Sequence, residues 1–146
     1  MYFDDFAVGQ RFVTRGCTLS EGQILDFAFQ YDPQPFHIDK EAAAKSPYGG
    51  VIASGFQTLL VAFRMFYAAG IINEGSIGSP GMDELRWLQP VRPGDTLHVE
   101  AEVLEVRPSR SRADRGTVVI ANRVLAQTGT VVMTYRTIHL QQRRPA

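Results

Sequence analysis

The longest hydrophobic stretch of the chain predicts one long buried helix near its middle. Residues 54–69 are apolar at nearly every position, so the predicted helix has almost no face suited to solvent. Ser54 is a typical N-cap residue, and Gly70 is typical of the position after a helix end. A helix that is apolar on nearly every face must be enclosed by other structure, which the rest of the chain has to provide.

The second half of the chain alternates between hydrophobic and polar residues, as a strand with one buried face does. Leu97 and Val99, for example, alternate with His98 and Glu100. Four strands are predicted in this half, at residues 82–88, 96–106, 117–126 and 130–140. Turns are predicted at residues 93–95 and 126–129. Together with the long helix, these strands predict an α+β fold in which an antiparallel sheet curls around the helix.

The first third of the chain predicts a strand and two shorter helices. The strand covers residues 9–18. Ser20 and Gln23 then match a capping box, and the helix that they begin should end near Tyr31. A second, short helix is predicted at residues 40–45, with Asp39 as its N-cap.

The segment between these two helices carries the candidate chemistry. It places Asp32 and His37 five residues apart, with Pro33 and Pro35 between them. The residue before a proline avoids helical geometry, so the segment is predicted to be an ordered, extended turn that aims both side chains at one point. An aspartate and a histidine that converge on a water can serve as general acid and base. The start of the long helix, at Gly55, would add free N–H groups for an oxyanion.

Composition and charge exclude several other classes of function. The 146 residues, 45% hydrophobic and 21% charged, fit one globular domain spanning residues 1–146. Fifteen basic residues balance fifteen acidic ones, so no overall charge favours nucleic acid or a membrane surface. Cys17 is the only cysteine, and we find neither a signal-peptide pattern nor an apolar run long enough to span a membrane. A cytoplasmic location is therefore expected.

Three motifs, in this order, resemble the MaoC-like branch of the hot-dog superfamily, which includes the (R)-specific enoyl-CoA hydratases. That family carries Asp-x-Asn-Pro-x-His, and residues 32–37 read Asp-Pro-Gln-Pro-Phe-His. The other two motifs are Ala-Ser-Gly at residues 53–55 and the strand-and-turn segment at residues 86–96. The similarity extends from about residue 3 to residue 140, and the order of the motifs is what makes it specific. Two positions depart from the family pattern, namely Gln34 in place of Asn and Tyr31 in place of Gly.

The resemblance implies a single hot-dog domain and a hydro-lyase. Such an enzyme adds water to an α,β-unsaturated acyl thioester of coenzyme A or acyl carrier protein, or removes it, without a metal or redox cofactor. It implies that Asp32 and His37 activate the water and that the Gly55 N–H binds the thioester oxygen. A glycine there would also let a substrate approach the backbone closely. A homodimer or a dimer of dimers is implied as well.

Several residues near these motifs have two interpretations. Ser54 fits a helix N-cap better than a nucleophile, because no second histidine lies near it in the sequence. Gln34 could hold the neighbouring loop or contact substrate. Tyr31 could line an acyl pocket or pack on its helix. Phe56 belongs to a row of large apolar residues that is more typical of core packing than of an acyl tunnel.

An arginine-rich segment at residues 107–115 also has two interpretations. It contains four arginines and joins two predicted strands, which is typical of a solvated hairpin loop. Alternatively, Arg110 and Arg112 contact the phosphates of coenzyme A. His98 and His139 do not look like ligands, and no cluster of residues has metal-site spacing.

Two other functions remain open on the sequence alone. A hot-dog thioesterase also uses a carboxylate and the positive end of a helix. A non-catalytic module could keep the fold and only bind acyl-CoA. Asp32 and His37 could also be purely structural, with Asp32 capping the turn and His37 satisfied by hydrogen bonds.

Overall fold

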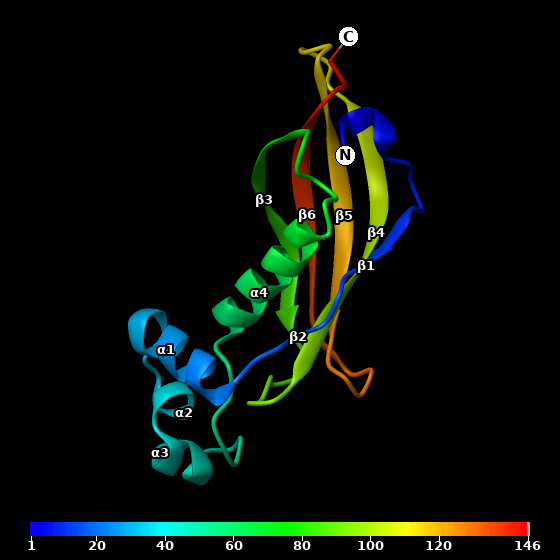
Figure 1. Ribbon diagram of the computed structural model, residues 1–146. Helices are drawn as coiled ribbons and strands as arrows, with labels where there is room; N and C mark the ends of the chain where they lie inside the picture. The colour runs from blue at the N-terminus through cyan, green and yellow to red at the C-terminus, as the bar shows by residue number, and fades with distance from the viewer. Residues whose placement is uncertain (146) are drawn as a thin grey trace.

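The computed structural model describes residues 1–145, and Figure 1 shows a long antiparallel sheet with one helix lying across one of its faces. Three shorter helices gather beyond the N-terminal end of that helix. In chain order the elements are η1 (Phe3–Asp5), β1 (Arg11–Val13), β2 (Cys17–Thr18), α1 (Glu21–Tyr31), α2 (Pro35–Ile38), α3 (Lys40–Lys45), α4 (Gly55–Ala68), β3 (Ser76–Trp87), β4 (Thr96–Pro108), β5 (Arg115–Leu125) and β6 (Val131–Gln142). This arrangement confirms the predicted α+β class.

The sheet is built from two long hairpins and an edge strand. Its strands follow the order β1-β4-β5-β6-β3, all antiparallel, and β2 pairs with β4 beyond β1. The turn that joins β5 and β6 closes with a hydrogen bond from the Ala126 N–H to the Thr130 carbonyl at 3.0 Å. The predicted turn at residues 126–129 is therefore confirmed.

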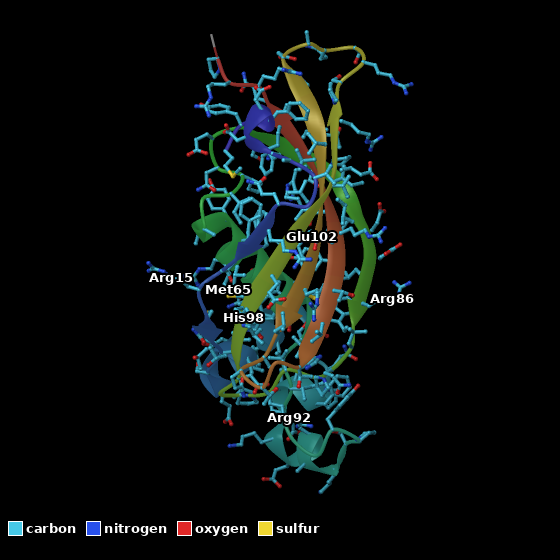
Figure 2. The ribbon with its side chains drawn as sticks, turned by 90° about the vertical axis from the view of Figure 1, so that its right-hand side faces the viewer. Arg15, Met65, Arg86, Arg92, His98 and Glu102 are labelled. Carbon is cyan, nitrogen blue, oxygen red and sulfur yellow. The ribbon has the colours of Figure 1, made fainter. Side chains whose placement is uncertain are left out.

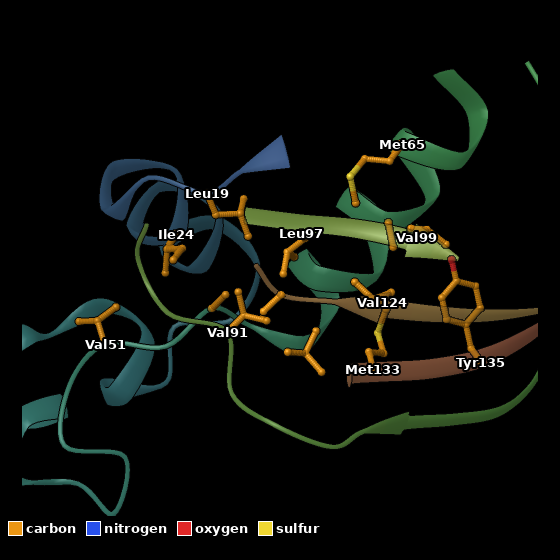
Figure 3. Close-up of a cluster of buried hydrophobic side chains, with 14 of the residues drawn as sticks. Leu19, Ile24, Val51, Met65, Val91, Leu97, Val99, Val124, Met133 and Tyr135 are labelled. Atoms are coloured by element: carbon orange, nitrogen blue, oxygen red, sulfur yellow. The ribbon is translucent and has the colours of Figure 1, made fainter. Parts of the chain in front are cut away.

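The core lies between α4 and the inner face of the sheet. On β4, Leu97, Val99, Ala101 and Val103 are buried and alternate with more accessible polar residues, as predicted. Figure 3 shows Met65 of α4 above the core side chains of the central strands. In Figure 2, Met65 lies on the helix side of the sheet, whereas Arg86 of β3 projects from the other side.

One face of α4 is left uncovered by the sheet within a single chain. Phe56, Leu60, Phe63 and Tyr67 lie three or four residues apart along this face and are all exposed. The edge strand β3 is exposed at every position except Leu85. Unpaired edges and apolar faces of this kind are usually covered by a further chain.

Three of the predicted strands differ from the structure by only one or two residues at their ends, and the other two differ more. The strand predicted at residues 9–18 is divided into β1 and β2. Between them the Thr14 side chain accepts a hydrogen bond from the Val99 N–H at 2.9 Å, which takes the place of a ladder bond. The strand β3 begins at Ser76 rather than at residue 82. The prediction missed residues 76–81 because they are rich in Gly, Ser and Pro and carry no strand pattern.

Candidate active site

The end of α1 and the whole of α2 bring the two candidate catalytic residues together. α1 starts with the predicted capping box of Ser20 and Gln23. Asp32 follows its last residue and has torsions outside the helical region (φ −151°, ψ 70°). The prediction of an extended turn is wrong for the second half of the segment, because Pro35 begins one helical turn. Proline suits the first position of a helix, since its fixed φ is already helical.

His37 is a buried residue whose ring is fixed by hydrogen bonding. Its Nδ1 lies 2.7 Å from the carbonyl oxygen of Ile52, and its Nε2 lies 3.3 Å from Oδ2 of Asp32. Because a carbonyl can only accept, Nδ1 carries the proton in this contact. Nε2 is then the ring nitrogen that faces Asp32 and the cavity side of the site.

Asp32 is held by two side-chain hydrogen bonds. The Ser54 hydroxyl donates to Oδ2 at 2.7 Å, and the Gln34 amide donates to Oδ1 at 2.8 Å. Burial alone would raise the pKa of Asp32, but these two hydrogen bonds and the neighbouring His37 outweigh it and lower the pKa below its usual value. Asp32 is therefore ionised at neutral pH. This contact supports the interpretation that Gln34 holds the loop that carries Asp32.

Ser54 has a role that the sequence did not indicate. The predicted N-cap is present, because its hydroxyl oxygen accepts a hydrogen bond from the Phe56 N–H at 3.3 Å. The same hydroxyl also donates to Asp32 from 22 residues away in the sequence. Ser54 is completely buried and does not line the cavity described below, so it acts on Asp32 instead of contacting a substrate. No local sequence pattern signals such a contact.

A cavity of about 460 Å³ opens beside these residues. Asp32, Gln34, His37, Gly55 and Phe56 all line it. Gly55 is the first residue of α4, and its N–H has no hydrogen-bond partner among residues 1–145. The cavity thus combines an ionised carboxylate, an imidazole and a free helix N-terminal N–H, which are the groups needed to activate a water and stabilise an oxyanion.

Three predicted site residues lie away from this cavity. Tyr31 is 70% exposed and does not line it; its ring packs 5.2 Å from that of Phe27, so the packing interpretation is the one that the structure favours. Arg110 and Arg112 lie in the β4–β5 hairpin. In Figure 1 this hairpin is at the end of the sheet opposite to α1, α2 and α3. The two arginines therefore do not reach Asp32 within one chain.

One residue of the cavity was present in a motif but had no predicted role. Trp87, the last residue of β3, lines the cavity beside Gly55. Its contact with Gly55 spans 32 residues, and neither residue carries a pattern that would pair it with the other.

Within residues 1–145 we find no cluster of three or more histidine, cysteine or carboxylate side chains placed to hold a metal ion. Over the same part of the chain, none of the helices is long and apolar enough to cross a membrane.

Comparison with known proteins places the chain in a family. Its sequence matches the family described as "MaoC like domain" over residues 5–127. The crystal structure of the MaoC-like dehydratase from Rhodospirillum rubrum superposes with a TM-score of 0.93 at 41% identity, covering 100% of this chain and 99% of that one. The 3-hydroxybutyryl-CoA dehydratase of Methylorubrum extorquens is 31% identical over 121 residues, which are 77% of this chain and 70% of that protein.

A further solved structure identifies the fold. A conserved hypothetical protein from Mycobacterium tuberculosis with a double hot-dog fold has a TM-score of 0.82 at 24% identity, covering 99% of this chain and 45% of that one. This similarity confirms the hot-dog architecture that the order of the motifs predicted. The chain belongs to the MaoC-like dehydratase family.

Proposed function

We propose that this protein is a hydro-lyase of the (R)-specific enoyl-CoA hydratase or 3-hydroxyacyl-CoA dehydratase type. Membership of a family with named dehydratases supports the general class of reaction. The observation that carries the proposal is the arrangement of three groups in one cavity. The ionised Asp32 lies 3.3 Å from Nε2 of His37, and Gly55, whose N–H has no partner among residues 1–145, lines the same cavity.

In the proposed reaction, a water in the cavity contacts both Asp32 and His37. One of the pair accepts a proton from the water as its oxygen bonds to C3 of the enoyl thioester. The displaced electron pair moves through C2 to the thioester oxygen, where the Gly55 N–H stabilises the enolate. The proton is then delivered to C2, which completes the addition of water. The net reaction adds H and OH across the double bond without oxidation or reduction, so it requires no redox cofactor, and in this proposal the acid, base and oxyanion donor all come from the protein rather than from a metal.

The free N–H of Gly55 supplies the electrostatic part of this mechanism. A donor of this kind interacts more strongly with the negative oxygen of the transition state than with the ground-state carbonyl, and losing one costs about 3–4 kcal/mol of barrier. The positive end of the α4 dipole adds to the same effect.

The proposed substrate is a thioester of coenzyme A or acyl carrier protein whose acyl group carries no charge. The described side chains that line the cavity include the carboxylate of Asp32 but no lysine or arginine. A free carboxylate on the acyl group would therefore face Asp32 without a compensating cation, which is electrostatically unfavourable.

The proposed assembly is a homodimer or a dimer of dimers that covers the exposed face of α4 and the edge strand β3. A two-fold axis through an edge strand pairs the two copies antiparallel, so the hairpin end of one copy points toward the cavity end of the other. Arg110 and Arg112 of one copy would then lie on the side from which coenzyme A enters the other copy's site. Sedimentation at micromolar concentration tests this assembly, and a protein that sediments only as a monomer would contradict it.

The first experiment follows the absorption band of the enoyl thioester with crotonyl-CoA and with longer or branched enoyl-CoAs. We expect the band to disappear with the unaltered protein and the rate to fall at least about 100-fold in Asp32→Asn, which keeps the shape but removes the base. Asp26→Asn is the matched control, because Asp26 is an exposed carboxylate on α1 that does not line the cavity. Release of free thiol would instead indicate a thioesterase, and thermal stabilisation without turnover would indicate a binding module.

A further inference from the structure

Trp87 lies directly against Gly55, the first residue of α4. Its indole N–H donates a hydrogen bond to the Gly55 carbonyl oxygen at 2.9 Å. A Cβ atom added to Gly55 would lie 2.5 Å from Cε2 and Nε1 of the indole, which is closer than real Cβ atoms come to other atoms. The space beside Gly55 that a side chain would need is therefore occupied by Trp87. Packing against the indole is thus a second reason for glycine at this position, beside the expected approach of a substrate.

The indole is itself anchored to the sheet. Trp87 pairs with Met133 of β6, and the next N–H along the chain, that of Leu88, donates to the Val132 carbonyl at 2.8 Å. The ring of Phe56 meets the indole edge-on, with centroids 5.9 Å apart. Trp87 thus connects the first turn of α4 to the paired strands β3 and β6.

The peptide groups on the two sides of Gly55 are held by different parts of the protein. On one side, the Ser54 carbonyl, which shares a peptide plane with the Gly55 N–H, accepts a hydrogen bond from the Thr58 N–H at 3.1 Å. On the other, the Gly55 carbonyl accepts from Trp87. The N–H between these two contacts is without a partner among residues 1–145. Its direction is set by the first peptide plane, and Trp87 holds the peptide group that follows.

We propose that Trp87 is a positioning residue that holds the Gly55 N–H in the direction needed to bind the developing oxyanion. This inference rests on the proposed hydro-lyase function. Catalytic donors have to be held within about 0.5 Å of their productive position, and a displacement of about 1 Å can cost about 100-fold in rate. A side chain that locks the first turn of the helix against the sheet meets this requirement.

The first test compares Trp87→Phe with the unaltered protein. Phenylalanine keeps an aromatic ring against Gly55 but cannot donate to its carbonyl. We expect kcat to fall about tenfold, with KM changed less than about threefold, because the oxyanion contact forms fully only in the transition state. Met82→Ala is the control, since Met82 is on the same strand, has a similar exposed fraction (40% against 47%) and does not line the cavity. It should leave kcat unchanged.

The second test combines Gly55→Ala with Trp87→Ala. If Trp87 is the reason for glycine, Gly55→Ala lowers kcat much more in the unaltered protein than in Trp87→Ala, where the added methyl group has room. Equal factors in the two backgrounds, or an unchanged kcat in Trp87→Phe, would overturn the proposal. If Trp87→Ala does not fold, the split between kcat and KM in Trp87→Phe decides alone. Absence of turnover in the unaltered protein would instead refute the hydro-lyase function and, with it, any role of Trp87 in that reaction.

Discussion

Ser54 connects the start of α4 to the candidate base, so replacing it by alanine should change the pH dependence of the reaction. Its hydroxyl donates to Asp32 at 2.7 Å and is completely buried, so that no solvent water can take its place without rearrangement. The hydrogen bond favours the ionised carboxylate and is one of the causes of the lowered pKa of Asp32. Ser54→Ala removes it and leaves the burial, which acts in the opposite direction.

The size of this effect can be worked out from the contact that is lost. A hydrogen bond to a charged group contributes about 1.5–3 kcal/mol, and this stabilisation of the ionised carboxylate is lost in Ser54→Ala. The pKa of Asp32 should therefore rise. Since the reaction needs the ionised form, the acid limb of the profile of kcat/KM against pH should move to higher pH. The loss of the N-cap should also cost about 1 kcal/mol of folding stability.

The assay is the rate of enoyl-thioester hydration from pH 3 to pH 9, so that the acid limb of the unaltered protein falls within or at the edge of the range. Ser46→Ala is the matched control, because the Ser46 hydroxyl also makes local hydrogen bonds, to the Ala43 carbonyl and from the Tyr48 N–H, but none to Asp32. It should lower stability without moving the acid limb. An acid limb at the same pH in Ser54→Ala and in the unaltered protein would refute the assignment of Asp32 as the group that must be ionised.

Three further predictions concern stability and substrate binding. Burial lowers the pKa of His139 from 6.5 to about 4, so the free energy of unfolding should fall by about 3 kcal/mol as the pH drops from above 6.5 to 4. Denaturant unfolding of His139→Phe should lack this part of the decrease. Parallel plots of stability against pH for the two proteins would contradict the cause. Gly116→Ala should destabilise the protein by about 1–3 kcal/mol, because its Cβ would overlap the ring of Phe3 in η1, whereas Gly81→Ala has open space and should cost less in a thermal melt. Replacing Arg110 and Arg112 by alanine should raise KM for a CoA thioester but not for a pantetheine analogue, and equal effects on both would exclude contact with the phosphates.

The elements that the sequence predicted well are those whose signals are local. The capping box of Ser20 and Gln23 and the N-cap of Asp39 each involve residues no more than three positions apart. The alternation along β4 follows directly from its hydrophobic pattern. The approach of Asp32 to His37 could also be predicted, because only five residues and two prolines separate them. Only the exact path between them, with a helical turn at its end, was missed.

The parts that could not be predicted depend on contacts between distant segments. The contact between Ser54 and Asp32 spans 22 residues, and that between Trp87 and Gly55 spans 32. A serine before a helix predicts a cap, but the second hydrogen bond of the same hydroxyl depends on where α1 ends in space. The uncovered face of α4 has a related explanation. An apolar helix surface predicts burial in the complete assembly without indicating which chain provides the cover.

The proposed chemistry depends on the position of a single helix end. Ser54 caps α4 and lowers the pKa of Asp32, while Trp87 holds the carbonyl of the next residue, Gly55. A movement of this helix end would therefore alter the ionisation of the base and the direction of the oxyanion donor together. Variants that loosen the start of α4 should accordingly be slower at every pH, and the acid limb of their pH profile should lie at higher pH. Variants that disturb only His37 should not move the ends of the helix. This coupling distinguishes a site organised around the helix start from two independent catalytic groups that only share a cavity.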